Sequence, residues 1–169
     1  MDGETWLASC HPDPEEAQRQ WERPPHLARL PTGRRFDALR LSQPLGLTVL
    51  WELGGQAEKV PVLEQHIEIR PVFYILTEPR EAGSWPRQPD SATVLTAGAE
   101  LTVPSPHADA LTGVQRHSLL WRTAPDGSGH LADPDVLRTA LALARDTDRQ
   151  KARIRAARSA FYGAKHRRQ

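Results

Sequence analysis

The sequence has few of the features that mark secreted or membrane proteins. Its one cysteine, Cys10, has no second cysteine with which to form an internal disulfide, and no apolar leader precedes it. No window approaches the roughly 20 apolar residues that cross a bilayer, and the most apolar helical stretches, near residues 45–53 and 136–144, are much shorter. These absences exclude membrane insertion and predict a cytoplasmic protein.

Motifs of the common catalytic sites are also missing. The chain has no G-x-S-x-G nucleophile motif, no P-loop, no G-x-G-x-x-G after a predicted strand and no H-E-x-x-H. His66, His117 and His130 do not have metal-ligand spacing, and a single cysteine excludes the usual structural zinc site. We therefore predict no metal site and no resident cofactor, with Mg²⁺ or Mn²⁺ expected only if the protein is catalytically active.

Charge is divided unevenly along the chain. Residues 1–144 contain 13 Lys and Arg against 19 Asp and Glu, a net charge of −6, whereas residues 145–169 contain nine against two, a net charge of +7. A basic terminal block favours polyanions because its binding releases their counterions. The alternative is a solvated helix whose charges bind nothing. We predict an α/β domain at residues 1–144 and a basic helical tail at residues 145–169.

The N-terminal region contains a clear helix signal between residues 13 and 25. Asp13 is suited to cap the helix, Pro14 to occupy its first position and Pro24-Pro25 to stop it. The apolar side of this helix is narrow, so we expect Trp21 to anchor it to the rest of the domain.

Alternating apolar and polar residues predict strands at residues 27–31, 36–41 and 60–69, and shorter segments at 92–95, 100–103 and 117–122 are also predicted as strands. Residues 72–77 contain VFYIL, a run that is apolar throughout, so we predict a central strand there. The polar side of residues 60–69 is expected to face solvent. The two short segments on either side of the turn at residues 96–99 are expected to pair with each other.

Helical spacing predicts two further helices, one over residues 42–55 and one that begins after Asp133 and ends at Gly163. The order of the elements predicts an α+β fold, an α/β sandwich in which helices pack on a mixed β-sheet and a basic helix follows at the C-terminus.

Several short pieces of the chain occur in an order that resembles a known family. They are WLAS from Trp6, WERPP from Trp21, LPTGRRFD from Leu30, PLG from Pro44, VFYIL from Val72, LTVPSPH from Leu101, Trp121 and LADPDVL from Leu131. Together they span about residues 6–144 and resemble the bifunctional DNA primase/polymerase N-terminal (Prim-Pol) domain in its short actinobacterial form. The resemblance implies a primase-polymerase core, a turn before a strand that ends in an Asp-x-Asp metal-binding pair, and a later segment that lines the nucleotide site.

The metal-binding pair of that family does not carry over to this chain. The pair would fall near Arg40 and Ser42 or, in another register, at Asp37 and Leu39, and neither register supplies two carboxylates. Two-metal phosphoryl transfer needs oxygen ligands that hold divalent ions close together. Asp37 is therefore a lone catalytic candidate, and the resemblance implies a primase/polymerase-like protein with a degenerate catalytic motif.

A nucleotide pocket is nevertheless implied by the resemblance. Its candidate residues are the turn at Thr32 and Gly33, the neighbouring Arg34 and Arg35, whose guanidinium groups suit phosphate, and the later Ser105 and His107. Trp85, in a loop rich in proline, is a candidate for stacking on a base.

Three functions remain open at this point. The first is binding of nucleic acid or nucleotides, in DNA replication or regulation, through cations of the tail: Lys151, Arg153, Arg155, Arg158, Lys165, Arg167 and Arg168. The second is an adaptor that uses Ile154, Phe161 and Tyr162 to contact a protein partner. The third is an active DNA primase/polymerase, which would require Glu64, Glu68 or Asp109 to converge on Asp37.

Overall fold

The computed structural model describes the chain from residue 1 to residue 166, apart from residues 68–69, 82, 89–91 and 109–117; for residues 161–166 it describes the helix alone. The helices are α1 (Gly3–Ala8), α2 (Pro14–Glu22), α3 (Gln43–Leu53), the short 3₁₀ helix η1 (Gly54–Gln56) and α5 (Pro134–His166). The strands are β1 (Leu27–Pro31), β2 (Asp37–Ser42), β3 (Val62–Ile67), β4 (Arg70–Thr77), β5 (Ala92–Leu95), β6 (Glu100–Pro104) and β7 (Leu119–Thr123).

The strands form a five-stranded sheet in the order β5-β2-β4-β3-β7 and a separate β1-β6 ribbon. Each pairing of these strands is antiparallel, and a single bridge between Thr77 and Ala132 is parallel. The predicted α+β fold with packing helices is confirmed, although two antiparallel sheets take the place of one mixed sheet. Strand pairing differs from the prediction in one more respect: β5 and β6 do not pair with each other, because β5 joins β2 and β6 joins β1.

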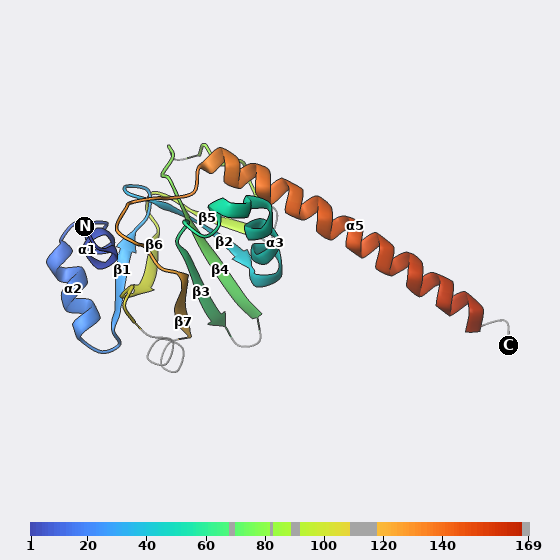
Figure 1. The fold of residues 1–169 in the computed structure, drawn as a ribbon, viewed down its shortest axis with the longest axis horizontal. Helices are drawn as coiled ribbons and strands as arrows, with labels where there is room; N and C mark the ends of the chain where they lie inside the picture. Colours follow the sequence, from blue (N-terminus) through green and yellow to red (C-terminus); the bar gives the residue numbers. More distant parts are fainter. Residues whose placement is uncertain (68–69, 82, 89–91, 109–117, 167–169) are drawn as a thin grey trace.

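A hydrophobic core lies on each face of the larger sheet (Figure 1). On one face, α1, α2 and the β1-β6 ribbon bury residues that include Trp6, Trp21 and Phe36. On the other face, α3 and the first turns of α5 cover Phe73 and other residues of the central strands. No helix in the described part of the chain combines the length and the apolar character that a membrane span requires.

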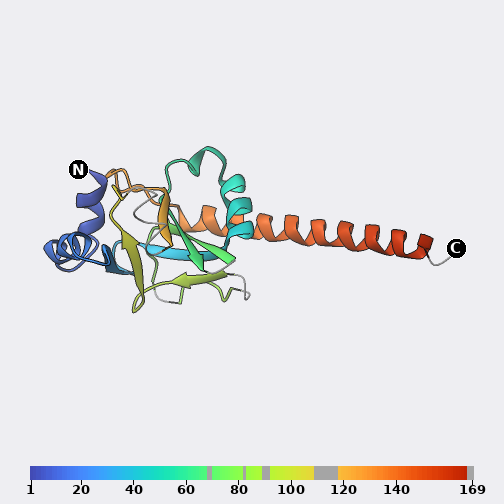
Figure 2. The ribbon, with the colours of Figure 1, turned by 90° about the horizontal axis from the view of Figure 1, so that it is seen from below.

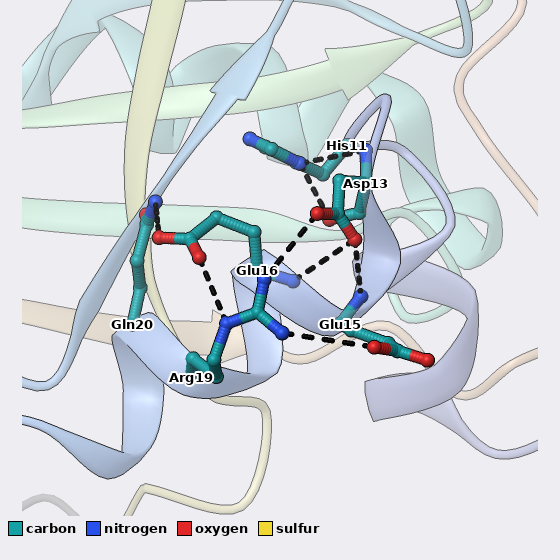
Figure 3. Close-up of polar contacts among 6 residues, drawn as sticks. All are labelled: His11, Asp13, Glu15, Glu16, Arg19 and Gln20. Atoms are coloured by element: carbon teal, nitrogen blue, oxygen red, sulfur yellow. Dashed lines mark hydrogen bonds and ion pairs between the residues drawn. The ribbon is translucent and has the colours of Figure 1, made fainter.

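The predicted N-terminal helix is confirmed as α2. Figure 3 shows its first turn, where Asp13 Oδ1 accepts hydrogen bonds from the backbone amides of Glu15 (3.1 Å) and Glu16 (3.3 Å). The Arg19 guanidinium pairs with Glu16 at 2.9 Å and reaches Asp13 at 3.3 Å. Trp21 anchors the helix as predicted, since its side chain is buried and its Nε1 donates to the carbonyl of Val103 at 3.1 Å.

The C-terminal helix α5 has two parts with different surroundings. Its start is confirmed, because Asp133 Oδ1 accepts hydrogen bonds from the amides of Asp135 (2.8 Å) and Val136 (3.2 Å). Leu137, Leu141 and other residues up to position 144 pack against the body. Residues 151–160 are exposed, and the helix runs away from the body (Figures 1 and 2). The helix was predicted to end at Gly163 but continues to His166, so the proposed boundary at residues 144 and 145 falls inside one helix.

Candidate functional site

The predicted nucleotide-binding turn is a structural turn that joins two segments of the body. Thr32 is 2% exposed, and its Oγ1 donates hydrogen bonds to the carbonyls of Thr96 (2.6 Å) and Ala99 (3.1 Å). Gly33 has φ of +86°, and a Cβ at this position would lie 2.3 Å from the Cα of Ala97. The glycine is therefore needed for the conformation and close approach of this turn, and the threonine hydroxyl is already engaged.

The later predicted segment is engaged with the N-terminal helix. Ser105 Oγ donates to Glu4 Oε2 at 2.7 Å and accepts from the backbone amide of His107 at 3.2 Å. The same Glu4 oxygen lies 4.0 Å from His107 Nε2. A carboxylate at the centre of this group repels phosphate, so Ser105 and His107 lack the electrostatic setting of a phosphate site.

These two groups of residues lie at opposite ends of the β1-β6 ribbon. Pro31 is paired with Glu100 at one end and Leu27 with Pro104 at the other. Four residues of a strand span roughly 13 Å. Arg34 and Arg35 are exposed beside the first group. The structure therefore does not bring the six predicted nucleotide-binding residues into one pocket.

Asp37 is the first residue of β2 and is completely buried. Its Oδ2 accepts a hydrogen bond from the Arg80 amide at 3.1 Å, whereas its Oδ1 and the Trp85 Nε1 have no hydrogen-bond partner among the described residues. Burial raises the pKa of Asp37, and the nearby Arg80 amide, Trp85 indole and Gly33 amide oppose that rise. Asp37 thus ties β2 to the loop after β4. The half-buried Trp85 packs against the core that α3 and α5 cover. This packing leaves its ring poorly placed to stack on a base.

No second carboxylate joins Asp37 in the described parts of the chain. On β4, Asp37 of β2 is paired with Thr77, and Glu64 of β3 is paired with Phe73. Glu64 is therefore displaced from Asp37 by roughly 13 Å along the strands and by two strand spacings across the sheet. Glu68 and Asp109 lie outside the described residues. No group of three or more His, Cys, Asp and Glu side chains with metal-binding geometry occurs within the described ranges.

Glu64 belongs to a polar cluster that the sequence pattern did not predict. The expected solvent-facing position is wrong: Glu64 is 7% exposed, because the start of α3 covers it. Its Oε1 accepts from Gln43 Nε2 at 3.1 Å and lies 3.0 Å from His66 Nε2, and its Oε2 lies 3.8 Å from Arg122 Nη1. Arg122 also lies over the ring of Phe73, 5.5 Å from the centroid. Partners from three elements therefore stabilise this buried carboxylate.

An open cleft of about 650 Å³ lies between η1, the end of β4 and the segment before α5. Glu78, Asp126 and Asp133 line it together with Lys59 and His130. Its carboxylates outnumber its cations, so it is not suited to a nucleoside triphosphate.

The base of α5 is held against the loop that contains Trp85. Arg80 forms an ion pair with Asp135 of α5, and Arg145 Nη1 donates to Gln88 Oε1 at 3.0 Å. Burial and the neighbouring Arg149 lower the pKa of Arg145. These contacts, which no sequence motif indicated, set the direction in which the helix leaves the body (Figure 2).

The projecting part of α5 brings several predicted nucleic-acid-binding residues together. Lys151, Arg153, Arg155 and Arg158 are exposed and form no ion pair with any described residue. Arg149 is paired with Asp146 at 2.8 Å. No Asp or Glu occurs from residue 149 to the end of the chain, so the positive charge of this part of the helix is not neutralised locally.

The remaining tail residues fall beyond the described side chains. Lys165, Phe161 and Tyr162 lie in the last turns of α5, for which the helix alone is described, and Arg167 and Arg168 lie outside the described residues.

Comparison with known proteins finds no matching family model, no matching curated protein and no matching solved structure, so the inferences that follow rest on the residues of this chain.

Proposed function

We propose that the protein binds nucleic acid through the projecting part of α5, residues 149–160, and performs no catalytic step at Asp37. One observation carries the proposal: four exposed cations, Lys151, Arg153, Arg155 and Arg158, stand without a described acidic partner on a helix that extends clear of the body. Such cations can replace the counterions of a phosphate backbone without first breaking an ion pair.

The spacing of the cations favours duplex DNA. At about 100° per residue, Lys151, Arg155 and Arg158 lie on one side of the helix, and Arg149 and Arg153 lie roughly opposite. Small residues between the two rows, Ala152, Ala156 and Ser159, let the helix approach closely. The major groove of B-DNA, about 12 Å wide, admits an α-helix, and its walls are phosphates on both sides. The deep, narrow major groove of A-form RNA does not admit one.

The proposal is tested by titrating a fluorescently labelled DNA duplex with the full chain at several salt concentrations. If the four cations each neutralise one phosphate, the log-log slope of affinity against salt is about −3.6. The triple variant Lys151→Gln, Arg155→Gln, Arg158→Gln should reduce the slope by about 2.7.

The matched control removes the same charge from the body, through Arg23→Gln, Arg29→Gln and Arg87→Gln, all at exposed positions. It should leave the slope almost unchanged. Binding that ignores salt, or a triple α5 variant that keeps the full slope, contradicts the proposal.

An adaptor function is the second candidate, and it is favoured by a different surface. Trp51 on α3 is 83% exposed and Leu47, one helical turn earlier, is 43% exposed. Exposed aromatic residues are enriched where proteins contact one another. Three results together would establish an adaptor. The chain captures one protein partner, Trp51→Ala abolishes that capture, and the chain shows no salt-sensitive DNA binding.

A primase-polymerase ancestry, a role in replication or DNA regulation and a cytoplasmic location stay predictions. An active enzyme requires oxygen ligands around Asp37 beyond those described. Template-dependent nucleotide incorporation with Mg²⁺ or Mn²⁺ that is abolished by Asp37→Asn would establish catalysis and replace the non-catalytic proposal.

A further inference from the structure

The helix α5 carries an exposed apolar stripe that the body does not cover. Its largest exposed members are Val136 (39% exposed), Leu143 (49%) and Ile154 (49%). The stripe alternates steps of four and three residues through positions 136, 140, 143, 147, 150, 154 and 157; Thr147 and Gln150 are polar, and Ala140 is buried against the body. This 4-3 spacing is the heptad pattern by which one α-helix packs against another in a coiled coil.

The exposed part of the stripe can face an antiparallel second copy of itself with apolar residues opposite apolar ones. About a two-fold axis between Asp148 and Arg149, Leu143 meets Ile154 of the second copy and Thr147 meets Gln150. In a two-fold interface each of these pairs occurs twice.

The charges beside the stripe have the same complementarity. Asp146 and Arg153 each follow an inward position by three residues, so they flank the same side of the stripe. Around the same two-fold axis, Asp146 of one copy lies next to Arg153 of the other. A parallel pair would instead place Arg153 beside Arg158 of the second copy, which is unfavourable.

We infer that α5 forms an antiparallel two-helix coiled coil with α5 of a second copy of this chain. The stripe lies to one side of the buried residues Leu137 and Leu141, and its members Val136 and Leu143 are exposed, so the body leaves this face open. An antiparallel arrangement also sends the two bodies to opposite ends of the pair.

The coiled coil accounts for a helix that otherwise extends alone. Most helical stability in proteins comes from packing an apolar face against another element. Lys151, Arg155 and Arg158 lie to one side of the stripe and stay exposed in the pair, whereas Arg153 faces Asp146 of the second copy. The dimer is measured without nucleic acid, so its test does not depend on the proposed nucleic-acid binding.

The first experiment measures the mass of the full chain by sedimentation across micromolar concentrations, without nucleic acid. The expected result is a reversible dimer. Ile154→Asp should weaken it by roughly tenfold or more, because it buries an unpaired charge. The control Ala152→Asp introduces the same charge at an exposed position off the stripe and should leave the dimer intact. A chain that is monomeric at every concentration overturns the inference.

The second experiment tests the register by disulfide formation. A mixture of Thr147→Cys and Gln150→Cys chains should form a cross-linked dimer under mild oxidation, while each variant alone should not. The native Cys10 is buried and does not interfere. Cross-linking of Thr147→Cys with itself would show a parallel pair and overturn the antiparallel arrangement.

A charge exchange separates the flanking ion pairs from the apolar contacts. Arg153→Asp should weaken the dimer, and adding Asp146→Arg in the same chain should restore it. Arg155→Asp, which changes the net charge equally but lies off the stripe, is the matched control. A double variant no tighter than Arg153→Asp alone would refute the proposed register.

Discussion

Gly46→Ala tests how closely α3 lies against the sheet. Gly46 is buried in the middle of α3, and a Cβ added there would lie 2.6 Å from Phe73 Cδ2, 3.1 Å from Cγ and 3.2 Å from Cβ. Phe73 is completely buried. Cβ does not move when the side chain rotates, and the burial of Phe73 leaves its ring little room to turn away. Either α3 or β4 must move by about 0.8 Å to reach the 3.4 Å at which ordinary contact begins.

The expected effect is the difference between two opposing terms. Alanine is favoured over glycine inside a helix by about 1 kcal/mol. Extra volume in a closely packed core costs about 1–3 kcal/mol, and the upper end applies here because both partners are buried and rigid. We therefore expect a net loss of about 2 kcal/mol in the free energy of unfolding, or a fall of roughly 4–8 °C in Tm.

The measurement is urea unfolding followed by tryptophan fluorescence, which five tryptophans provide. Gly55→Ala is the matched control, because no atom lies within 4 Å of its added Cβ, and it should change stability by no more than about 0.5 kcal/mol. Adding Phe73→Leu to Gly46→Ala should recover part of the loss, since the two sites are in contact. A Gly46→Ala protein as stable as wild type would refute the close packing of α3 on β4.

Three further predictions concern single polar groups. Asp13→Ala should lower the free energy of unfolding by about 1 kcal/mol, because the amides of Glu15 and Glu16 lose their cap, as urea titration will measure. Burial raises the pKa of the Cys10 thiol to about 12, so alkylation near neutral pH should be slow in the native state and fast in urea; fast native alkylation contradicts this. Burial also raises the pKa of Asp37, so the native state favours its protonated form. Wild type should therefore gain stability relative to Asp37→Ala as the pH falls from 7 toward the ordinary aspartate pKa of 3.8; unfolding curves with the opposite trend would show a stabilising charge.

Local signals in the sequence determined where most elements begin and end. The Asp13-Pro14 and Asp133-Pro134 pairs start α2 and α5 because a cap and a preset backbone angle act within one helical turn. Gly54 ends α3 for the same kind of local reason. Alternation of apolar residues located β1 to β3, and a continuous apolar run located β4, since both patterns are local to a strand. The uneven charge of the chain and the basic C-terminal helix could also be predicted from the sequence.

Only the tertiary structure decided which of these elements meet. It placed β5 and β6 in different sheets, separated Thr32 from Ser105 by the length of a ribbon, and buried Glu64 under the start of α3. It also left Leu143 and Ile154 in solvent while burying Leu137 and Leu141 on the same helix. The physical reason is that capping and periodicity act over a few residues, whereas pairing and burial depend on surfaces contributed by distant parts of the chain.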